Sequence, residues 1–481
     1  MDPADGKELF RGAANDEQSD LNDHVQVEVP LGRALSIEVR DSERVIERTV
    51  TLHAPEELQS FVLETGTPLA IEAALSESDT AFVGSPDGAR LRARLDEYFA
   101  AAPDVRAAFE FAADLDALLT HHPTAVRSLA WRAYIRSGTH ASLREDFQAS
   151  RVRYKELTSP YTLRAVGRMP KGGWPLFVAM HGGGGVPKEV NDSQWRHMQI
   201  YYRDQKQLEG YLYLALRAPN DVWNGFYDGY SLKLAEELIR QMVLCANVDS
   251  DRAFLMGYSH GGYGAFHQGL NLADRFAAVH ASASAPTEGN LRGRNLRNTP
   301  FTFMIGEKDT MYERLVRCQS FARFMDEVRW RENGYPVRME LKLGFGHGGL
   351  PDRDKIQEMY AHVRNPVPRR LTWVLNGVTQ QFSWLRVPET GRGEVNASVE
   401  ANRVSLVADD LEKGAIDVYL DERLVDLSKP VEISVNSERS VCKLTPSIRT
   451  LCESLVERGD PQLAFTVRLE LKPHRVRIGR L

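Results

Sequence analysis

The chain has 481 residues, of which 42% are hydrophobic and 26% charged, a composition typical of soluble globular proteins. This length exceeds what one compact core usually holds and predicts two or three domains. A formal net charge of -6 gives no reason to expect nucleic acid or an anionic membrane as a partner, and no apolar run long enough for a transmembrane helix occurs.

The start of the chain lacks the pattern of a secretory signal peptide. Met1 is followed by Asp2, Asp5 and Glu8, with no apolar stretch behind a basic start. We therefore expect a soluble protein, cytoplasmic as the sequence stands and exported only if a leader has been removed. The cysteines have neither metal-ligand spacing nor the spacing of a disulfide framework, so no metal site is predicted. They are Cys245, Cys318, Cys442 and Cys452.

The first part of the chain divides into a leader and a small module. Residues 1–23 are polar and acidic without periodicity, which is typical of a flexible leader. Alternating segments then predict short strands, and the period becomes helical over residues 89–136. Residues 24–148 are therefore expected to form an α+β module of unknown function. Its predicted strands are His24–Val29, Leu35–Val39 and Val45–Leu52.

Short apolar runs alternate with amphipathic helical patterns over residues 149–366. Arg151–Val166 predicts a strand pair that turns at Ser159–Pro160, and Leu176–Met180 is wholly apolar, as a strand buried on both faces requires. This alternation predicts a doubly wound α/β domain with a mostly parallel sheet. Further strands are expected at Tyr211–Arg217, Arg252–Met256, Ala277–Ala285, Phe301–Ile305 and Val337–Leu343, and helices at Ser231–Cys245, Gly261–Leu270 and Glu313–Asn333.

A segment with two prolines, Asn365–Arg370, marks the end of this pattern. Beyond it the helical period largely disappears, and short segments separated by Gly, Pro, Asn and Asp predict strands. Residues 367–481 are therefore expected to form a small β-rich, sandwich-like domain with one helix at Thr445–Arg458. The expected strands are Leu371–Leu375, Gln381–Val387, Glu394–Val399, Arg403–Val407, Ala415–Leu420, Val431–Val435 and Phe465–Leu471.

One stretch of the predicted sheet carries a pattern with chemical meaning. The apolar segment Phe254–Met256 runs into Gly257–Gly261, which has the spacing Gly-x-Ser-x-Gly around Ser259, and a helix-compatible segment follows. A strand, this spacing and a helix together predict a sharp turn that lifts a serine hydroxyl above the sheet. The two glycines are expected because such a turn leaves no room for a Cβ atom. An ordinary turn serine is the alternative.

A serine hydroxyl becomes a nucleophile when a histidine takes its proton and a carboxylate fixes the histidine tautomer. Downstream of Ser259, Asp309 and a glycine-flanked His347 each follow a predicted strand. Functional groups of open α/β sheets gather at the carboxyl ends of strands, so these three residues are predicted to form a catalytic triad. Glu307 remains a rival for the acid, and Asp309 could instead cap the next helix.

The tetrahedral intermediate of acyl transfer carries an oxyanion that needs preformed N–H donors. His260 would supply one through its backbone, while its ring, a rival base, is expected to point away from the serine. Gly182 and Gly183 are the other predicted donors, because the glycine run after residues 176–180 lets the backbone approach closely. A phosphate-cradling loop is the alternative, but no Gly-Lys-Ser/Thr follows and no GxGxxG spacing fits.

Aromatic and amide side chains cluster after the strand predicted at residues 211–217. Such residues at the exit of a strand often line a substrate cleft, and equally often they only pack within the loop, so both interpretations stay open. The candidate substrate-binding residues are Trp223, Asn224, Phe226 and Tyr227.

Five segments together resemble the esterase and polyhydroxybutyrate-depolymerase-like branch of the α/β-hydrolases, over about residues 150–365. The resemblance implies the α/β-hydrolase fold and assigns the triad and the oxyanion hole to the residues named above. The chain from Pro368 onward resembles the β-rich C-terminal extensions of bacterial proteins described as predicted peptidases. The five segments are Met180–Gly185, Asn247–Arg252, Gly257–Gly264, Gly306–Asp309 and Gly344–Gly349.

We therefore expect a serine hydrolase that cleaves a small or polymeric carboxylic ester without a metal or organic cofactor. In this mechanism Ser259 attacks to form an acyl-enzyme, His347 transfers the proton and Asp309 orients the imidazole. The same groups can cleave amides, so a serine peptidase acting on peptides is the nearest alternative. A binding or scaffolding protein with a silent triad is the alternative from a different class.

Overall fold

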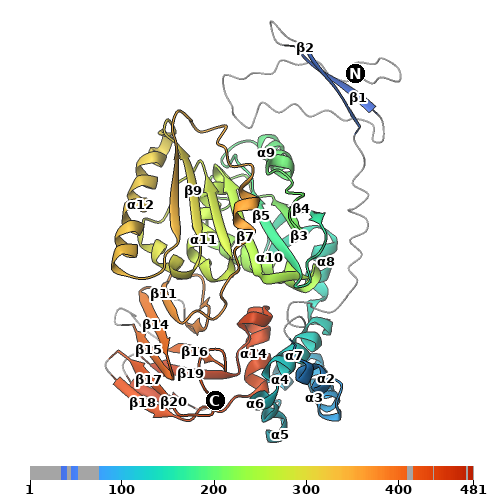
Figure 1. Ribbon diagram of the computed structural model, residues 1–481, viewed down its shortest axis with the longest axis vertical. Helices are drawn as coiled ribbons and strands as arrows, with labels where there is room; N and C mark the ends of the chain where they lie inside the picture. The colour runs from blue at the N-terminus through green and yellow to red at the C-terminus, as the bar shows by residue number, and fades with distance from the viewer. Residues whose placement is uncertain are drawn as a thin grey trace.

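The computed structural model describes residues 34–40, 45–51, 75–389, 391–408, 415–436, 438–472 and 475–479. The predicted leader and the predicted strand His24–Val29 lie outside these residues. The described chain comprises N-terminal helices, a central α/β part and a β-rich C-terminal part (Figure 1). None of its described helices has the length and apolar character needed to cross a bilayer.

The central sheet has eight strands, most of them parallel. They are β3 (Arg151–Tyr154), β4 (Leu157–Gly167), β5 (Trp174–Met180), β6 (Gly210–Leu216), β7 (Val248–Tyr258), β8 (Ala278–Ser282), β9 (Phe301–Gly306) and β10 (Val337–Lys342). Their order is β10-β9-β8-β7-β5-β6-β4-β3, and only the β3–β4 and β4–β6 pairs are antiparallel. Strand β5 lies between β6 and β7, so the carboxyl ends of β5 and β7 flank the point where the winding reverses, which is where open α/β sheets bind ligands.

Helices cover both faces of this sheet. They are α9 (Lys188–Tyr201), α10 (Gly229–Cys245), α11 (His260–Asn271), α12 (Arg314–Arg331) and α13 (Lys355–Met359). Because side chains alternate along a strand, Phe177 and Phe254 belong to the core beneath α9 and α13, whereas Leu176 and Leu255 belong to the core beneath α10, α11 and α12. The mostly parallel, doubly wound α/β domain predicted from the sequence is confirmed.

One turn of this domain was predicted at the wrong position. The β3–β4 hairpin turns at Lys155–Glu156, and Ser159 and Pro160 lie inside β4. Lys155 takes the left-handed conformation, with φ 53°, that two-residue hairpin turns use. Pro160 is tolerated because pairing with β3 ends there and pairing with β6 begins at the next residue, so its missing N–H interrupts no ladder.

The N-terminal part is a strand pair followed by a group of helices. Strands β1 (Ala34–Arg40) and β2 (Val45–Thr51) pair antiparallel at two of the predicted positions. The helices are α2 (Glu77–Val83), α3 (Pro86–Ala100), α4 (Pro103–Ala107), α5 (Ala113–Asp116), α6 (Leu118–His121), α7 (Pro123–Arg136) and α8 (Ala141–Gln148). The apolar stripe of α3 packs on α7, where the rings of Phe99 and Tyr134 lie 5.4 Å apart.

The C-terminal part contains two five-stranded sheets, ordered β11-β14-β15-β17-β18 and β12-β13-β16-β19-β20, as a sandwich-like domain requires. The strands are β11 (Arg370–Val374), β12 (Gln381–Phe382), β13 (Leu385–Arg386), β14 (Glu394–Glu400), β15 (Arg403–Val407), β16 (Ile416–Leu420), β17 (Val431–Val435), β18 (Glu438–Cys442), β19 (Val467–Lys472) and β20 (Arg475–Gly479). The single strand predicted at Gln381–Val387 is a hairpin, with Ser383 left-handed at its turn (φ 49°). The predicted helix starts later, as α14 (Ile448–Arg458), because Pro446 precedes its cap Ser447.

Buried ion pairs join the three parts. Arg127 of α7 donates to the carbonyl of Ala464 at 3.1 Å and pairs with Glu422 at 2.7 Å. Arg364, also buried, lies 2.7 Å from Asp251 of β7 and 2.9 Å from Asp460 after α14. The N-terminal helices therefore pack on the C-terminal part, and the proposed domain limits at residues 148 and 366 stay a prediction.

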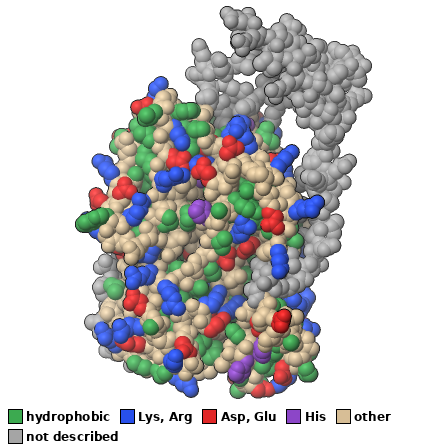
Figure 2. All heavy atoms as spheres, viewed as in Figure 1, with side chains coloured by type: hydrophobic (Ala, Val, Ile, Leu, Met, Phe, Trp, Pro, Cys, Tyr) green, Lys and Arg blue, Asp and Glu red, His purple; other side chains and the backbone are tan. Residues whose placement is uncertain are grey.

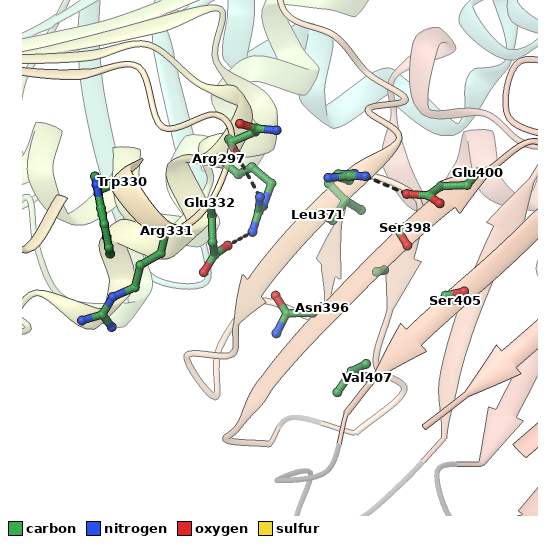
Figure 3. Close-up of a pocket in the computed structure, with 13 residues that line it drawn as sticks. Arg297, Trp330, Arg331, Glu332, Leu371, Asn396, Ser398, Glu400, Ser405 and Val407 are labelled. Carbon is green, nitrogen blue, oxygen red and sulfur yellow. Dashed lines mark hydrogen bonds and ion pairs between the residues drawn. The ribbon is translucent and has the colours of Figure 1, made fainter. Parts of the chain in front are cut away.

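The charged side chains of the surface are mixed in sign. Figure 2 shows basic and acidic side chains interspersed over the visible face, without a field of one sign. A cleft of about 420 Å³ separates the end of α12 from the outer face of β11, β14 and β15 (Figure 3). Two ion pairs line it, Arg297 with Glu332 and Arg370 with Glu400, and Arg331 is a further cationic residue of its lining.

Candidate active site

Ser259 alone forms the turn between β7 and α11. Its backbone has φ 54° and ψ -114°, a strained conformation that a residue other than glycine adopts only when its surroundings enforce it. Those surroundings include two hydrogen bonds, from its N–H to the carbonyl of Ser282 at 2.9 Å and from the N–H of Tyr263 to its own carbonyl at 3.0 Å. The strand–turn–helix context predicted for Gly-x-Ser-x-Gly is therefore present.

Close backbone packing explains why glycines flank Ser259. A Cβ atom on Gly257 would lie 2.1 Å from the carbonyl oxygen of Gly261, and one on Gly261 would lie 2.0 Å from that of Met180. Real Cβ atoms do not approach backbone oxygens so closely. The spacing therefore reflects three backbone segments, from β5, β7 and α11, that meet beneath the serine.

The side chains of Ser259, His347 and Asp309 form one hydrogen-bonded chain. Oγ of Ser259 lies 2.9 Å from Nε2 of His347, and Nδ1 of His347 lies 2.8 Å from Oδ2 of Asp309. An ionised carboxylate only accepts hydrogen bonds, so Nδ1 carries the proton and the Nε2 lone pair faces the serine hydroxyl. This is the tautomer with which an imidazole can take a proton from serine.

The carboxyl group of Asp309 is buried and ionised. Burial raises its pKa, but the hydrogen bonds from His347 and Arg314 and the positive charge of Arg314 outweigh burial and hold the pKa below the ordinary value. Nη1 of Arg314 lies 2.8 Å from Oδ1, so the two carboxylate oxygens have different partners. The sequence analysis missed Arg314, whose only signal is its position five residues after Asp309.

The rival acid has a different contact. Oε2 of Glu307 accepts a hydrogen bond from the backbone N–H of Gly344 at 2.9 Å, at the start of the loop that carries His347. The hydroxyl of Tyr258 donates to the carbonyl of His347 at 2.6 Å and fixes the other part of this loop. Glu307 and Tyr258 therefore hold the loop that carries His347 at two points, Gly344 and His347 itself.

The glycine run after β5 contacts the start of α11. Among the described residues, the N–H groups of Gly182 and Gly183 donate no hydrogen bond to a protein group, whereas the N–H of Gly184 donates to Oδ1 of Asn191 at 2.9 Å. Gly183 has φ 101°, and a Cβ atom there would lie 2.2 Å from Oδ1 of Asn191. The buried Asn191, on α9, also donates to the carbonyl of Gly184 at 2.9 Å and so clamps the loop.

Two histidines beside the glycine run are buried and neutral. Burial lowers the pKa of His181 well below its ordinary value, and Nε2 accepts a hydrogen bond from the N–H of Ala218 at 3.1 Å. Its Nδ1–H therefore donates to the carbonyl of Gly182 at 2.6 Å. Burial also lowers the pKa of His260 to about 3. Its ring packs among aromatic rings, 5.0 Å from that of Phe226, while its backbone N–H lies in the first turn of α11.

The four candidate substrate-binding residues have different surroundings. Trp223 is 43% exposed, and its ring lies 6.4 Å from that of His260 and 5.4 Å from that of Tyr312. Phe226 is 1% exposed and belongs to the core. Asn224 and Tyr227 line a separate cavity of about 520 Å³ against α10 and α11. Of these four residues, only Trp223 therefore offers an exposed surface beside the turn at Ser259.

Other exposed apolar side chains follow the triad along the chain. Met311 and Tyr312, just after Asp309, are 62% and 56% exposed, and Phe345, two residues before His347, is 38% exposed. We call the four exposed apolar side chains near these residues the aromatic rim: Trp223, Met311, Tyr312 and Phe345. Of these, Trp223 and Tyr312 are in ring contact. Such a surface suits an apolar group better than a charged one.

Three features together define the α/β-hydrolase fold: the order of the strands, the turn at Ser259 between β7 and α11, and the glycine run after β5. The N-terminal helices and the β-rich C-terminal part are additions to this fold. The α/β-hydrolase fold predicted from the sequence is therefore confirmed. No family model and no curated protein matches the chain.

Solved esterases are similar to part of this chain. A thermostable esterase is 19% identical with a TM-score of 0.37, covering 44% of this chain and 62% of its own. The poly(3-hydroxybutyrate) depolymerase LpqC from Bordetella parapertussis is 16% identical with a TM-score of 0.32, covering 40% and 81%. The enterobactin esterase FES from Shigella flexneri is 15% identical with a TM-score of 0.32, covering 42% and 54%. The assignment of the fold rests on the strand order, and no substrate is taken from these proteins.

Proposed function

We propose that the protein is a serine hydrolase that cleaves a carboxylic ester through an acyl-enzyme. The observation that supports this most is the hydrogen-bonded chain from Oγ of Ser259, on a strained elbow, through His347 to Asp309, with distances of 2.9 and 2.8 Å. A hydroxyl, an imidazole and a buried carboxylate in this order match the requirements of a base-activated nucleophile.

In the proposed reaction Oγ of Ser259 attacks the ester carbonyl carbon while its proton passes to Nε2 of His347. The N–H groups of His260 and of Gly182 or Gly183 donate to the resulting oxyanion. The bond to the leaving alcohol then breaks, and His347 returns the proton to that oxygen. Water attacks the acyl-enzyme in the second half, with His347 again as the base, and releases the carboxylic acid and free Ser259.

The aromatic rim favours an ester that carries an apolar group near the scissile bond. The rings of Trp223 and Tyr312 form an exposed pair next to His260, and Phe345 precedes the base by two residues. Their exposed surface would be removed from water by such a group, which contributes about 25 cal/mol per Å² of buried apolar area.

Labelling by a fluorophosphonate tests the proposal directly. We expect the folded wild type to be modified at Ser259, as located by mass spectrometry, and Ser259→Ala and His347→Ala to remain unlabelled. Heat-denatured wild type is the control for chemical reactivity outside the site. Absence of labelling in the folded wild type would contradict the proposal and favour a binding protein with a silent triad.

Matched substrates then separate esters from peptides. With the same acyl group, we expect turnover of the ester and no turnover of the amide above background. Because serine peptidases also cleave esters faster than amides, measurable turnover of the amide would assign the same site to a peptidase. Replacing Trp223 by Ala should raise KM for apolar esters more than for acetate esters, since only the former reach the aromatic rim.

A further inference from the structure

A charged guanidinium lies directly behind the carboxylate of the triad. Arg314, the first residue of α12, is 4% exposed and donates from Nη1 to Oδ1 of Asp309 at 2.8 Å. Its Nε donates to the hydroxyl of Tyr263 at 3.0 Å. Arginine keeps its charge in proteins, so a full positive charge is enclosed at the base of the site.

This guanidinium also touches the base. Nη1 of Arg314 lies 3.1 Å from Nδ1 of His347. Both nitrogens carry hydrogen, so they do not bond to each other; they converge as two donors on one carboxylate. Each oxygen of Asp309 therefore accepts one hydrogen bond, with Oδ1 engaged by Arg314 and Oδ2 left for His347.

Stability alone does not account for such a residue. Burying an ion pair costs about as much in desolvation as the pair returns, and apolar residues of similar size often serve as well. What the pair adds is orientation, because a carboxylate held at one oxygen cannot rotate freely about its last torsion. The charge also keeps Asp309 ionised, in agreement with its lowered pKa.

The two residues before Arg314 have a strained backbone, and the turn that they form places Arg314 beside Asp309. Tyr312 and Glu313 both take the left-handed conformation, with φ 53° and 56°, although neither is glycine. Such a conformation is strained in a residue other than glycine and persists only where the surroundings hold it. Here the guanidinium lies over the ring of Tyr312, 5.0 Å from its centre, while Trp223 packs on the same ring from the rim.

We infer that Arg314 is a positioning residue that aims Oδ2 of Asp309 at His347 and keeps the carboxylate ionised during catalysis. The inference rests on the proposed function. Arg314 transfers no proton and contacts no substrate in this role. The hydroxyl of Tyr263 holds the guanidinium in turn, and the strained turn at Tyr312 links it to the aromatic rim.

Steady-state kinetics of Arg314→Met tests this role, with Arg317→Met as the matched control. Arg317 lies one turn further along α12 and also lies over the ring of Tyr263, at 5.9 Å, but donates to the carbonyls of Pro286 and Tyr312 and not to the triad. With an activated ester we expect Arg314→Met to lower kcat about 100-fold at nearly constant KM, because a misplaced catalytic group costs about that factor. Arg317→Met should retain at least about half of the wild-type kcat, since it removes similar packing and no triad contact.

Two milder variants cover the case in which Arg314→Met does not fold. Arg314→Lys keeps the charge but not the forked geometry, and it should recover about a tenth of the wild-type kcat. Tyr263→Phe removes one hydrogen bond to the guanidinium and should lower kcat about 3- to 10-fold with KM unchanged. The rate of fluorophosphonate labelling at Ser259 should fall in parallel with kcat in each variant.

The outcomes separate the two proposals. If the wild type is not labelled at Ser259, the proposed function fails. If the wild type is labelled and folded Arg314→Met or Arg314→Lys reacts at the wild-type rate, the function stands and the role of Arg314 is wrong. A rise in KM at constant kcat would also overturn the inference, because it would make Arg314 a substrate-binding residue instead.

Discussion

Nδ1 of His347 and Oδ2 of Asp309 lie 2.8 Å apart although 38 residues separate them in the chain. They meet because β9 and β10 are parallel neighbours whose following loops leave the same edge of the sheet. Asp309→Asn would offer an amide N–H to Nδ1 and stabilise the wrong imidazole tautomer. We expect kcat on an ester to fall by about 10⁴ while the fold is retained, as steady-state kinetics and circular dichroism would show.

Glu307→Gln is the matched control for the acid. Glutamine keeps an oxygen that can accept from the N–H of Gly344, so kcat should change by less than about 3-fold. If Glu307→Gln were as damaging as Asp309→Asn, the acid would have been misassigned.

Gly183→Ala should impair the site without changing substrate affinity. An alanine Cβ there would meet Oδ1 of Asn191 at 2.2 Å and would also be strained at φ 101°. Displacing one N–H donor of an oxyanion hole costs about 10²–10³ in kcat. Gly185→Ala, in the same run, is the control, because its Cβ would lie 3.5 Å from the nearest atom, which belongs to Trp223. Equal kcat values for the two variants would contradict a role for Gly183.

Asp352 should make the free energy of unfolding depend on pH. Burial raises its pKa to about 6, although hydrogen bonds from Ser282 and Tyr201 act in the other direction. The folded protein therefore holds this proton more tightly than the unfolded chain, and the carboxyl's contribution to stability falls as pH rises from about 4 to about 6. The difference from the ordinary value of 3.8 corresponds to about 3 kcal/mol.

Asp352→Asn isolates this contribution, because asparagine can still accept from the hydroxyl of Tyr201. Urea unfolding at about pH 4 and about pH 7 should show that the variant gains up to about 3 kcal/mol relative to the wild type at the higher pH. A difference between the two proteins that does not change with pH would refute the assignment.

Arg364→Met should destabilise the contact between the central and C-terminal parts. It would leave Asp251 and Asp460 buried without their shared cation, and breaking a buried pair typically costs about 3–5 kcal/mol. Arg370→Met breaks the exposed pair with Glu400 and should cost less than about 1 kcal/mol. Thermal or urea unfolding of the two variants compares these costs, and similar values would contradict the importance of burial.

The layered fold could be predicted from the sequence because the patterns that indicate its strands and helices are local. A wholly apolar run such as Leu176–Met180 is typical of a strand with both faces covered, and the structure has β5 there. The positions of turns were harder to predict. Ser159 and Pro160 are typical turn residues, yet they lie inside β4, since the place where pairing changes partners depends on β3 and β6 together.

The polar contacts around the triad could not be predicted in the same way. Asn191 and Arg314 belong to no motif, and each acts through a side chain that reaches a loop from a neighbouring helix. Phe226 shows the opposite case, a residue that the sequence indicated as a candidate for substrate binding but that lies in the core. An aromatic residue in a loop after a strand can lie in the core or on the surface, and the sequence does not distinguish the two. The structure makes it core, because α11 packs over it at Gly264.

The sequence by itself determined the alternation of strands and helices and the Gly-x-Ser-x-Gly turn, because backbone sterics and apolar periodicity act between near neighbours. It also determined the order in which serine, aspartate and histidine follow strand ends. Only the tertiary structure decided that Asp309 rather than Glu307 meets His347, and that Arg314 and Asn191 brace the loops around them. Those contacts depend on distances of a few ångströms across the sheet. Strand register and helix packing set these distances, and no local sequence pattern predicts them.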